Sequence, residues 1–413
     1  MIYALCVSVF LTCFHISALS LELGFLSVSP GRISRIITIA LFLGLLLKER
    51  RLPGISKAGR YPVLFWLCFV LFSACSYFWS KDTHAWLKNT CSFAIGFIYL
   101  IIFLDTVKSA ASLRLLLGSF SLGIVMHNII AWYQAISGNY ILSDKTFSLS
   151  SVSFLYTPVS TQNNPNNLSL LLVFGIAACL VLFLMLKKPA LKAACVLLAA
   201  SSAFLIYLGA SRACLLALGL MAATVPVAVL PKKKALVFCG ILMAVAVAGF
   251  LVLPPLRSVV TEFKEIVQGT SSNTSDTIRW NLGLSCLHYT KETHGLGLGA
   301  GQFQYYMENF PTEYFTGHII KAHSWFAELL VNFGVLPFLG YLVFYVKLIL
   351  DFLRKKQSPL SKYMRGVLAG LLVGNVIGSI SPGTLSNTMW YHLLFGILTA
   401  AAVLPPDGNG LSA

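Results

Sequence analysis

Arg212 lies in a short turn, Gly209-Ala-Ser-Arg-Ala-Cys214, between two long apolar segments. The turn is so short that the flanking segments are expected to form a helical hairpin, with Arg212 opening the second helix. A guanidinium there adds a permanent charge and bidentate geometry to the positive end of a helix dipole. Such a position suits a phosphate group. The alternative is an arginine that binds lipid headgroups.

A second group of candidate residues begins in a long polar stretch and ends in the apolar segment after it. It contains Arg279-Trp280, alternating glycines from Gly295 to Gly301, and Lys321-Ala-His-Ser-Trp-Phe-Ala-Glu328. The glycines permit close backbone approach and unusual dihedral angles. Because the run neither follows a strand nor ends in Gly-Lys-Ser/Thr, it does not indicate a nucleotide-binding loop.

His323 lies where this polar stretch becomes apolar, which predicts an imidazole at the membrane face. A histidine with a pKa near neutrality can accept a proton from a sugar hydroxyl and so make it a better nucleophile. The alternative is an interfacial histidine that caps the next helix. The four histidines of the stretch match no zinc-site spacing and no HExxH motif, so we expect no metal and no other cofactor.

The composition predicts an integral membrane protein. Of 413 residues, 57% are hydrophobic and 11% are charged, against about a quarter charged in soluble proteins. Apolar runs of about 18 or more residues with few charges predict bilayer-spanning helices. The net charge of +16 comes from short Lys and Arg clusters between these runs, so it does not indicate a nucleic-acid partner.

About twelve membrane helices are expected, in an all-α fold. They are placed near residues 2–20, 33–48, 61–79, 90–106, 113–136, 166–186, 190–208, 212–230, 235–253, 323–350, 361–380 and 388–404. One set of alternate connections carries eighteen Lys and Arg residues and the other carries eleven. The richer set is expected to face the cytoplasm, together with both termini.

Two connections on the outer side are long, Ser137 to Pro165 and Pro254 to Ala322. Loops of this length are usually functional or disordered. The second is expected to hold amphipathic helices along the membrane face, with one apolar stripe at Val260, Phe263, Ile266 and Val267 and another at Ile278, Leu282, Cys286 and Leu287. The expected parts are therefore an N-terminal bundle (1–253), this loop (254–322) and C-terminal helices (323–413).

The combined pattern resembles the O-antigen ligase and polymerase superfamily of bacterial membrane glycosyltransferases. The matching pieces are Ser211-Arg212, Arg279-Trp280, the Gly295-to-Phe303 run, Ala322-His323 followed by Glu328 and Gly334, and the Asn163-Asn-Pro-Asn-Asn167 element. The resemblance spans most of the chain. It implies a glycan donor on undecaprenyl diphosphate and an active site on the extracytoplasmic face of the bacterial inner membrane.

Carried over by position, the resemblance implies that Arg212 and Arg279 bind the diphosphate and that His323 activates the acceptor hydroxyl. Supporting roles are implied for Ser211, Lys321, Glu328 and Asn166. Two arginines compensate the negative charge that develops on the leaving diphosphate, so the reaction needs no metal. It is expected to be one displacement with inversion.

The acceptor is left open by the sequence. Many members of the superfamily have Asn after the histidine, whereas this chain has Ser324, and its Ser-Trp-Phe continuation is similar to polymerases of Gram-positive teichuronic-acid and capsular pathways. A ligase transfers a finished glycan to lipid A core, and a polymerase transfers it to another lipid-linked repeat unit. The alternative from another class is a multi-pass transporter or flippase, for which internally repeated halves are typical, and no such repeat is apparent.

Overall fold

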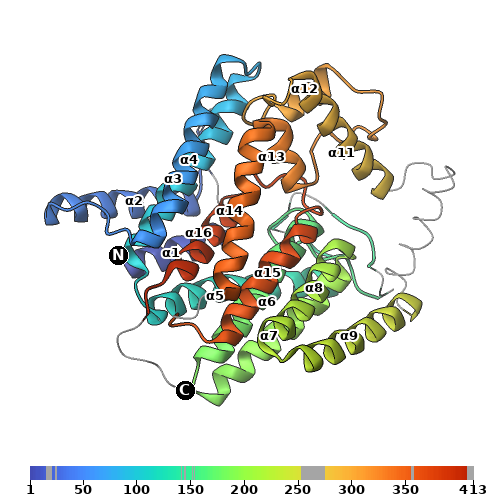
Figure 1. Cartoon of the computed structure of the whole chain (residues 1–413). Coiled ribbons are helices and arrows are strands. Elements are labelled where there is room, and N and C mark those ends of the chain that lie inside the picture. The colour runs from blue at the N-terminus through green and yellow to red at the C-terminus, as the bar shows by residue number, and fades with distance from the viewer. Residues whose placement is uncertain are drawn as a thin grey trace.

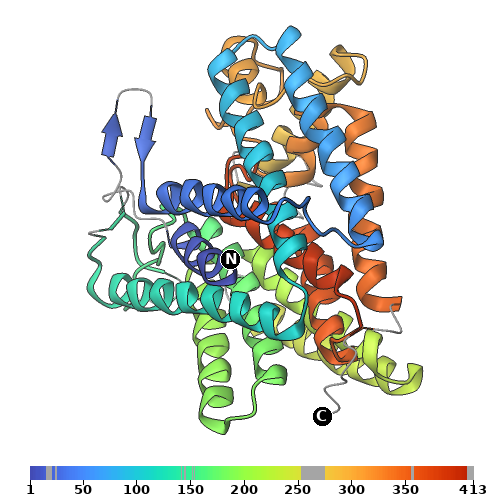
Figure 2. The same cartoon turned by 90° about the vertical axis from the view of Figure 1, so that its left-hand side faces the viewer.

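The computed structural model describes residues 1–14, 21–23, 26–140, 142–143, 146–150, 152, 154–252, 275–354 and 358–406. These residues are mainly helical, which confirms the predicted fold class. They also contain one short antiparallel hairpin of β1 (Leu21–Leu23) and β2 (Leu26–Val28), visible in Figure 2 and not predicted from the sequence.

The helices follow one another along the whole chain (Figure 1). They are α1 (Ile2–Cys13), α2 (Pro30–Glu49), α3 (Lys57–Cys75) with the 3-10 turn η2 (Ser76–Phe78), α4 (Thr83–Thr106), α5 (Ala110–Ser137), α6 (Pro165–Met185), α7 (Pro189–Leu208), α8 (Arg212–Val229), α9 (Lys232–Val252), α11 (Ser275–Glu292), α12 (Phe303–Asn309), α13 (Trp325–Phe333), α14 (Val335–Arg354), α15 (Lys362–Gly378) and α16 (Met389–Val403).

Eight helices of the described ranges are long and apolar enough to cross a membrane, namely α2, α3 with η2, α4, α5, α6, α7, α8 and α14. Helices α1 and α16 are apolar but shorter. The chain is therefore a multi-pass membrane protein. The count of twelve spans and the three-part division stay predictions.

Helices α8 and α15 pack closely because small residues line their contact. A Cβ atom added to Gly374 of α15 would lie 2.4 Å from the carbonyl oxygen of Ala217 in α8, and one added to Gly370 would lie 2.9 Å from that of Met221. Small residues let membrane helices approach closely and gain dispersion contacts. This contact holds the first turn of α8, which carries Arg212, against the end of α15.

The predicted helix over 323–350 is broken, and the break belongs to the glycine run. Gly334 separates α13 from α14 with φ +79°, and a Cβ atom added to Gly297 would lie 2.4 Å from the Gly334 nitrogen. Leu298 N–H donates to the Val331 carbonyl at 2.9 Å, and Val335 N–H donates to that of Gly295 at 2.8 Å. The backbone of the glycine run therefore occupies the space that a continuous helix over 323–350 would need.

The same glycine run also contacts the connection between α3 and α4. Trp79 Nε1 donates to the Gly297 carbonyl at 3.1 Å, and the side-chain oxygen of Gln302 accepts from the backbone nitrogens of Lys81 and Asp82 at 2.9 and 2.8 Å. Two connections that the charge pattern predicts to be on the outer side therefore lie together. In Figure 1 they meet beside α12 and α13.

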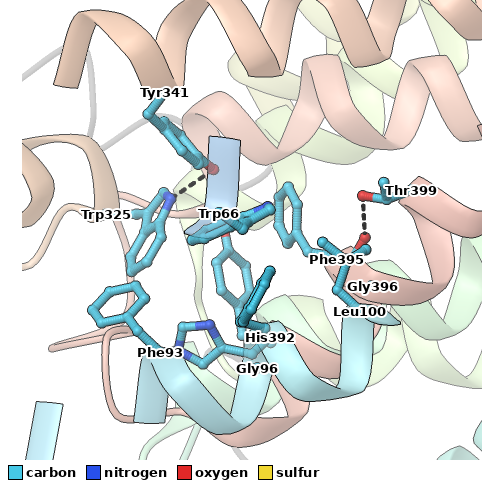
Figure 3. Close-up of a pocket in the computed structure, with 12 residues that line it drawn as sticks. Trp66, Phe93, Gly96, Leu100, Trp325, Tyr341, His392, Phe395, Gly396 and Thr399 are labelled. Carbon is cyan, nitrogen blue, oxygen red and sulfur yellow. Dashed lines mark hydrogen bonds between the residues drawn. The ribbon is translucent and has the colours of Figure 1, made fainter. Parts of the chain in front are cut away.

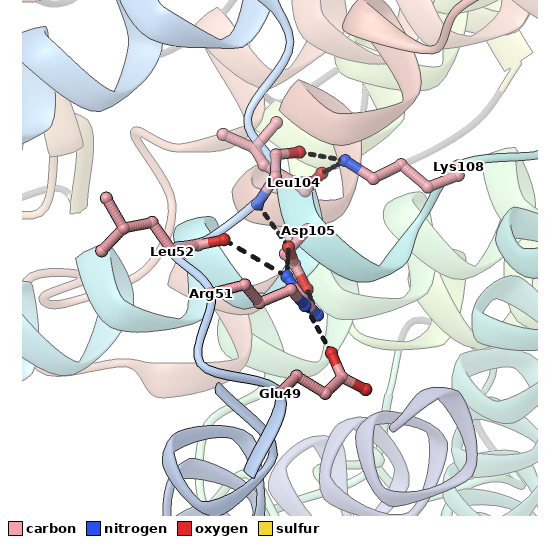
Figure 4. A network of polar contacts seen from close by, with 7 residues as sticks. Glu49, Arg51, Leu52, Leu104, Asp105 and Lys108 are labelled. Atoms are coloured by element: carbon pink, nitrogen blue, oxygen red, sulfur yellow. Dashed lines mark hydrogen bonds and ion pairs between the residues drawn. The ribbon is translucent and has the colours of Figure 1, made fainter. Parts of the chain in front are cut away.

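Two connections predicted to be cytoplasmic also meet each other, in the ion-pair network of Figure 4. Arg51, after α2, binds Asp105 near the end of α4 through two contacts of 2.7 and 3.1 Å. Glu49 accepts from Arg51 Nε at 2.5 Å, and Lys108 donates to the Leu104 carbonyl at 2.7 Å. The network ties the connections α2–α3 and α4–α5 together.

The described part of the long outer loop is only partly amphipathic as predicted. Leu282 and Cys286 of α11 are buried and Ile278 packs beside them, but Leu287 is 55% exposed. The inner face of α11 is set by its contact with α13, which turns Leu287 away. The stripe from Val260 to Val267 lies outside the described residues.

Candidate active site

Arg212 and Arg279, far apart in sequence, meet at one carboxylate. Arg212 is the first residue of α8 and Arg279 lies in the first turns of α11. Arg212 Nη2 is 3.1 Å from one oxygen of Asp276, and Arg279 Nη1 is 2.8 Å from the other. The three side chains are 19–32% exposed, so the cluster is accessible but largely screened from bulk solvent.

A chain of hydroxyl contacts links Arg212's neighbour Ser211 to α6. Ser381, in the connection between α15 and α16, donates its hydroxyl to the side-chain oxygen of Asn166 at 2.7 Å. Since a serine has one hydroxyl hydrogen, the Ser381 oxygen then accepts from Ser211, 2.9 Å away. Ser211 and Ser381 are buried, so this chain fixes the start of α8 against α6.

Ser381 also holds His323, through its backbone. His323 Nδ1 lies 3.3 Å from the Ser381 carbonyl, and His323 N–H donates to the Gly383 carbonyl at 3.0 Å. A carbonyl oxygen only accepts, so Nδ1 carries the proton and Nε2 carries the lone pair. His323 has φ +47°, a strained backbone conformation for a residue with a side chain, of the kind that clusters at functional sites.

The surroundings of His323 favour its neutral form. Burial lowers the pKa of the imidazole below its usual 6.5, and the positive charges of Arg279 and Lys321 lower it further, whereas the Ser381 carbonyl opposes the shift. Lys321 is exposed. Its aliphatic side chain lies against Gly383, next to the His323 imidazole. A neutral imidazole with a free lone pair on Nε2 is the form that accepts a proton.

Glu328 anchors the connection between α15 and α16 through hydrogen bonds to its carboxylate. It is 6% exposed and accepts hydrogen bonds from the hydroxyls of Thr384 and Ser386 and from the Leu385 nitrogen, the last at 3.0 Å. Burial raises the pKa of this carboxyl, and the hydrogen bonds oppose the shift. Glu328 therefore positions the segment that holds His323.

Five of the seven residues selected from the sequence lie against the connection between α15 and α16, namely Ser211, Asn166, His323, Lys321 and Glu328. The other two, Arg212 and Arg279, meet at Asp276. Sequence reasoning missed Ser381, Gly383, Thr384 and Ser386, although a polar run between two apolar segments, Ser379-Ile-Ser-Pro-Gly-Thr-Leu-Ser-Asn387, is a usable signal. Within the described ranges no three His, Cys, Asp or Glu side chains come together as metal ligands would.

Two pockets of opposite character flank the first residues of α13. A polar cavity of about 190 Å³ lies between the start of α4, the end of the glycine run, α13 and the connection between α15 and α16. An aromatic pocket of about 20 Å³ (Figure 3) lies deeper, where Trp325 Nε1 donates to the Tyr341 hydroxyl at 2.8 Å. The aromatic pocket has room for about one water, so of these two pockets the polar cavity is the one that can take a substrate group.

The described chain is thus a multi-pass helical membrane protein in which Arg212 and Arg279 share one carboxylate and the charge of Arg279 acts on His323. The family model described as O-Antigen ligase matches residues 194–345, a range that contains all three. The "Teichuronic acid biosynthesis protein TuaE" of Bacillus subtilis (strain 168) is 26% identical over 400 residues, which cover 93% of this chain and 80% of the relative. Together the two matches support placing the chain in the O-antigen ligase and polymerase superfamily.

Proposed function

We propose that this protein transfers a glycan from undecaprenyl diphosphate to a sugar hydroxyl of an acceptor, on the extracytoplasmic face of the inner membrane. The observation that carries the proposal is the meeting of Arg212 and Arg279 at one carboxylate, beside an imidazole that both burial and neighbouring cations keep neutral. The family match and the relative's name support a role in membrane glycan transfer.

On the donor side, the two guanidiniums hold the diphosphate. An arginine presents paired N–H donors that match phosphate oxygens, and Arg212 adds the positive end of the α8 dipole. These groups stabilise the charge that grows on the diphosphate as its bond to the sugar breaks. The arginines thus perform the task that a divalent cation performs in other transferases.

On the acceptor side, His323 Nε2 takes the proton of the attacking hydroxyl. The hydroxyl oxygen forms a bond to the anomeric carbon while the bond from that carbon to the diphosphate oxygen breaks, and the lipid diphosphate leaves as an anion. Attack from the face opposite the leaving group inverts the anomeric configuration. The Ser381 carbonyl, by holding Nδ1–H, keeps Nε2 as the basic nitrogen.

The acceptor is a second lipid-linked glycan rather than lipid A core. Two features support this choice: the relative named for teichuronic acid biosynthesis and the Ser-Trp-Phe sequence after His323.

Both termini lie in the cytoplasm, and residues 254–322 form the outer loop that completes the site between the bundles 1–253 and 323–413.

The test is a transfer assay with purified protein in lipid nanodiscs and purified lipid-linked repeat units. His323→Ala, Arg212→Ala and Arg279→Ala are expected to insert and fold normally but to lose product, and a chelator is expected to leave the wild type unchanged. Arg60→Ala is the control, since Arg60 is exposed on the predicted cytoplasmic side. Full activity of His323→Ala would exclude it as the base. Movement of the lipid across the bilayer without a new glycosidic bond would favour a flippase instead.

A further inference from the structure

The polar cavity is not part of the arginine cluster. Its lining comes from the start of α4, from Gly301 to Gln304, from α13 and from the connection between α15 and α16. It does not include Arg212, Asp276 or Arg279, and His323 adjoins it through its neighbour Ala322 without lining it. Its volume of about 190 Å³ is roughly ten times the space that one water needs. The cavity is therefore large enough for a ring-sized polar group.

Asn89 supplies an unmet hydrogen-bonding group in this cavity. It is 3% exposed, and its Nδ2 donates to the Ala85 carbonyl at 3.0 Å. Its Oδ1 is buried and meets no donor among the described residues. Buried polar atoms nearly always have a partner, so a ligand with a donor group, such as a hydroxyl, is the natural complement.

Gly301 lets the glycine run pack closely against the Asn89 amide. Gly301 has φ +72°, and a Cβ atom there would lie 2.0 Å from Asn89 Nδ2. The Gln304 amide and the Asn387 amide also line the cavity. Amide groups that both donate and accept suit a ligand whose hydroxyls also do both.

The cavity lies next to His323. Ala322, the residue before His323, lines the cavity, as does Thr384, the residue after Gly383. The position of a Cβ atom on Gly383 would be 3.7 Å from His323 Nε2, so the basic nitrogen and the cavity share one short backbone segment. The diphosphate site, in contrast, reaches this segment through Ser381 and Ser211.

We propose that the polar cavity between α4, α13 and the connection between α15 and α16 binds the acceptor saccharide and presents one of its hydroxyls to His323. This inference rests on the proposed function, because it uses His323 as the base. It assigns Asn89, Gln304 and Asn387 to acceptor recognition, and it separates the acceptor from the donor diphosphate.

The first test measures transfer kinetics of Asn89→Ala with each substrate varied in turn. The KM for the acceptor is expected to rise about tenfold, as for the loss of a buried hydrogen bond, while the KM for the donor stays unchanged. Gln304→Ala is a second variant with the same expectation if Asn89→Ala does not fold. A rise in the donor KM alone would assign the cavity to the donor's sugar and overturn the proposal.

Asn128→Ala is the matched control. Asn128 is a buried asparagine of α5 whose Nδ2 donates to the carbonyl four residues earlier, as Asn89 does, but it also binds Ser202 and lies away from the cavity. It should lower the melting temperature without changing either KM. Equal effects of Asn128→Ala and Asn89→Ala on the acceptor KM would reduce Asn89 to a structural role and overturn the proposal.

A binding experiment separates this inference from the proposed function. The probe is the oligosaccharide that mild acid releases from the lipid-linked repeat units used in the transfer assay. It is added to the wild type and to the variants, and the melting temperature of each is measured. Stabilisation of the wild type and of Arg279→Ala, but not of Asn89→Ala, is expected even if no transfer occurs. Equal stabilisation of all three, or of none, would overturn the cavity as a saccharide site.

Discussion

Two ion-pair networks in this protein are built from the same residue types, arginine and aspartate, but they differ in composition and in exposure. In the network of Figure 4, Arg51 is matched by two carboxylates, Asp105 and Glu49. In the cluster at Asp276, two arginines, Arg212 and Arg279, bind the same carboxylate. The Asp105 side chain is 5% exposed, whereas that of Asp276 is 32% exposed.

The composition of each network decides what it can bind. A cation surrounded by two anions has little attraction left for a third, so the Arg51 network ties two connections together. Two guanidiniums beside one partly exposed carboxylate offer paired N–H donors whose geometry also fits phosphate oxygens. The Arg51 network therefore stabilises the fold, and the cluster at Asp276 is suited to an anionic substrate.

The largest expected effect is that of His323→Gln. Glutamine keeps a neutral polar side chain of similar reach but cannot act as a base, so kcat should fall about 10²- to 10⁴-fold. The KM for the donor should stay constant, because the arginines are untouched. The measurement is steady-state transfer with both substrates varied. Loss of donor binding with kcat unchanged would contradict the base role.

The next effect directly contrasts the two networks. Arg279→Lys keeps the charge but loses the paired donors, so kcat/KM for the donor should fall about 10- to 100-fold. Arg51→Lys should leave transfer unchanged and lower the melting temperature. Both variants are assayed for transfer and for thermal unfolding in the same detergent. The comparison fails if Arg51→Lys loses as much transfer as Arg279→Lys.

A smaller effect concerns pH. The pKa of His323 is lowered by burial, Arg279 and Lys321, so the active neutral form persists below pH 6.5 and activity declines only as pH falls through the lowered pKa. Lys321→Met removes one of the cations, which raises the pKa of His323 and moves the acidic limb of the kcat/KM profile to higher pH. Lys291→Met, at an exposed residue of α11, is the control and should leave the acidic limb in place. An acidic limb that stays in place in Lys321→Met would exclude this coupling.

The sequence points to the ionisable residues of the candidate site more readily than to their surroundings. Arg212 and His323 are visible because ionisable groups at the borders of apolar segments are rare and costly, whereas Arg279 lies in the polar stretch and is singled out by the resemblance. Ser381 is invisible in this sense, because its value lies in a backbone carbonyl and a hydroxyl that meet His323 and Ser211 only in the folded chain.

The helices themselves are predicted well where hydropathy decides them, and less well where the backbone of another segment does. Residues 323–350 are predicted as one apolar helix, yet the break at Gly334 is imposed by contact with Gly297, distant in sequence. The partnership of Asn89 with Gly301 is equally non-local. Such contacts depend on how loops dock, which composition and periodicity along one segment do not describe.

The smallest expected effect, of Asp276→Asn, has the opposite sign to the others. If Asp276 competes with the diphosphate for both guanidiniums, removing its charge should lower the KM for the donor about two- to fivefold, in line with the modest strength of partly exposed ion pairs. Asp105→Asn is the matching change in the Arg51 network. It should leave the KM for the donor unchanged while lowering the melting temperature. A higher donor KM in Asp276→Asn would mean that the carboxylate holds the arginines in place for the substrate. In that case the two networks would differ in location only, since each aspartate would then orient its arginine.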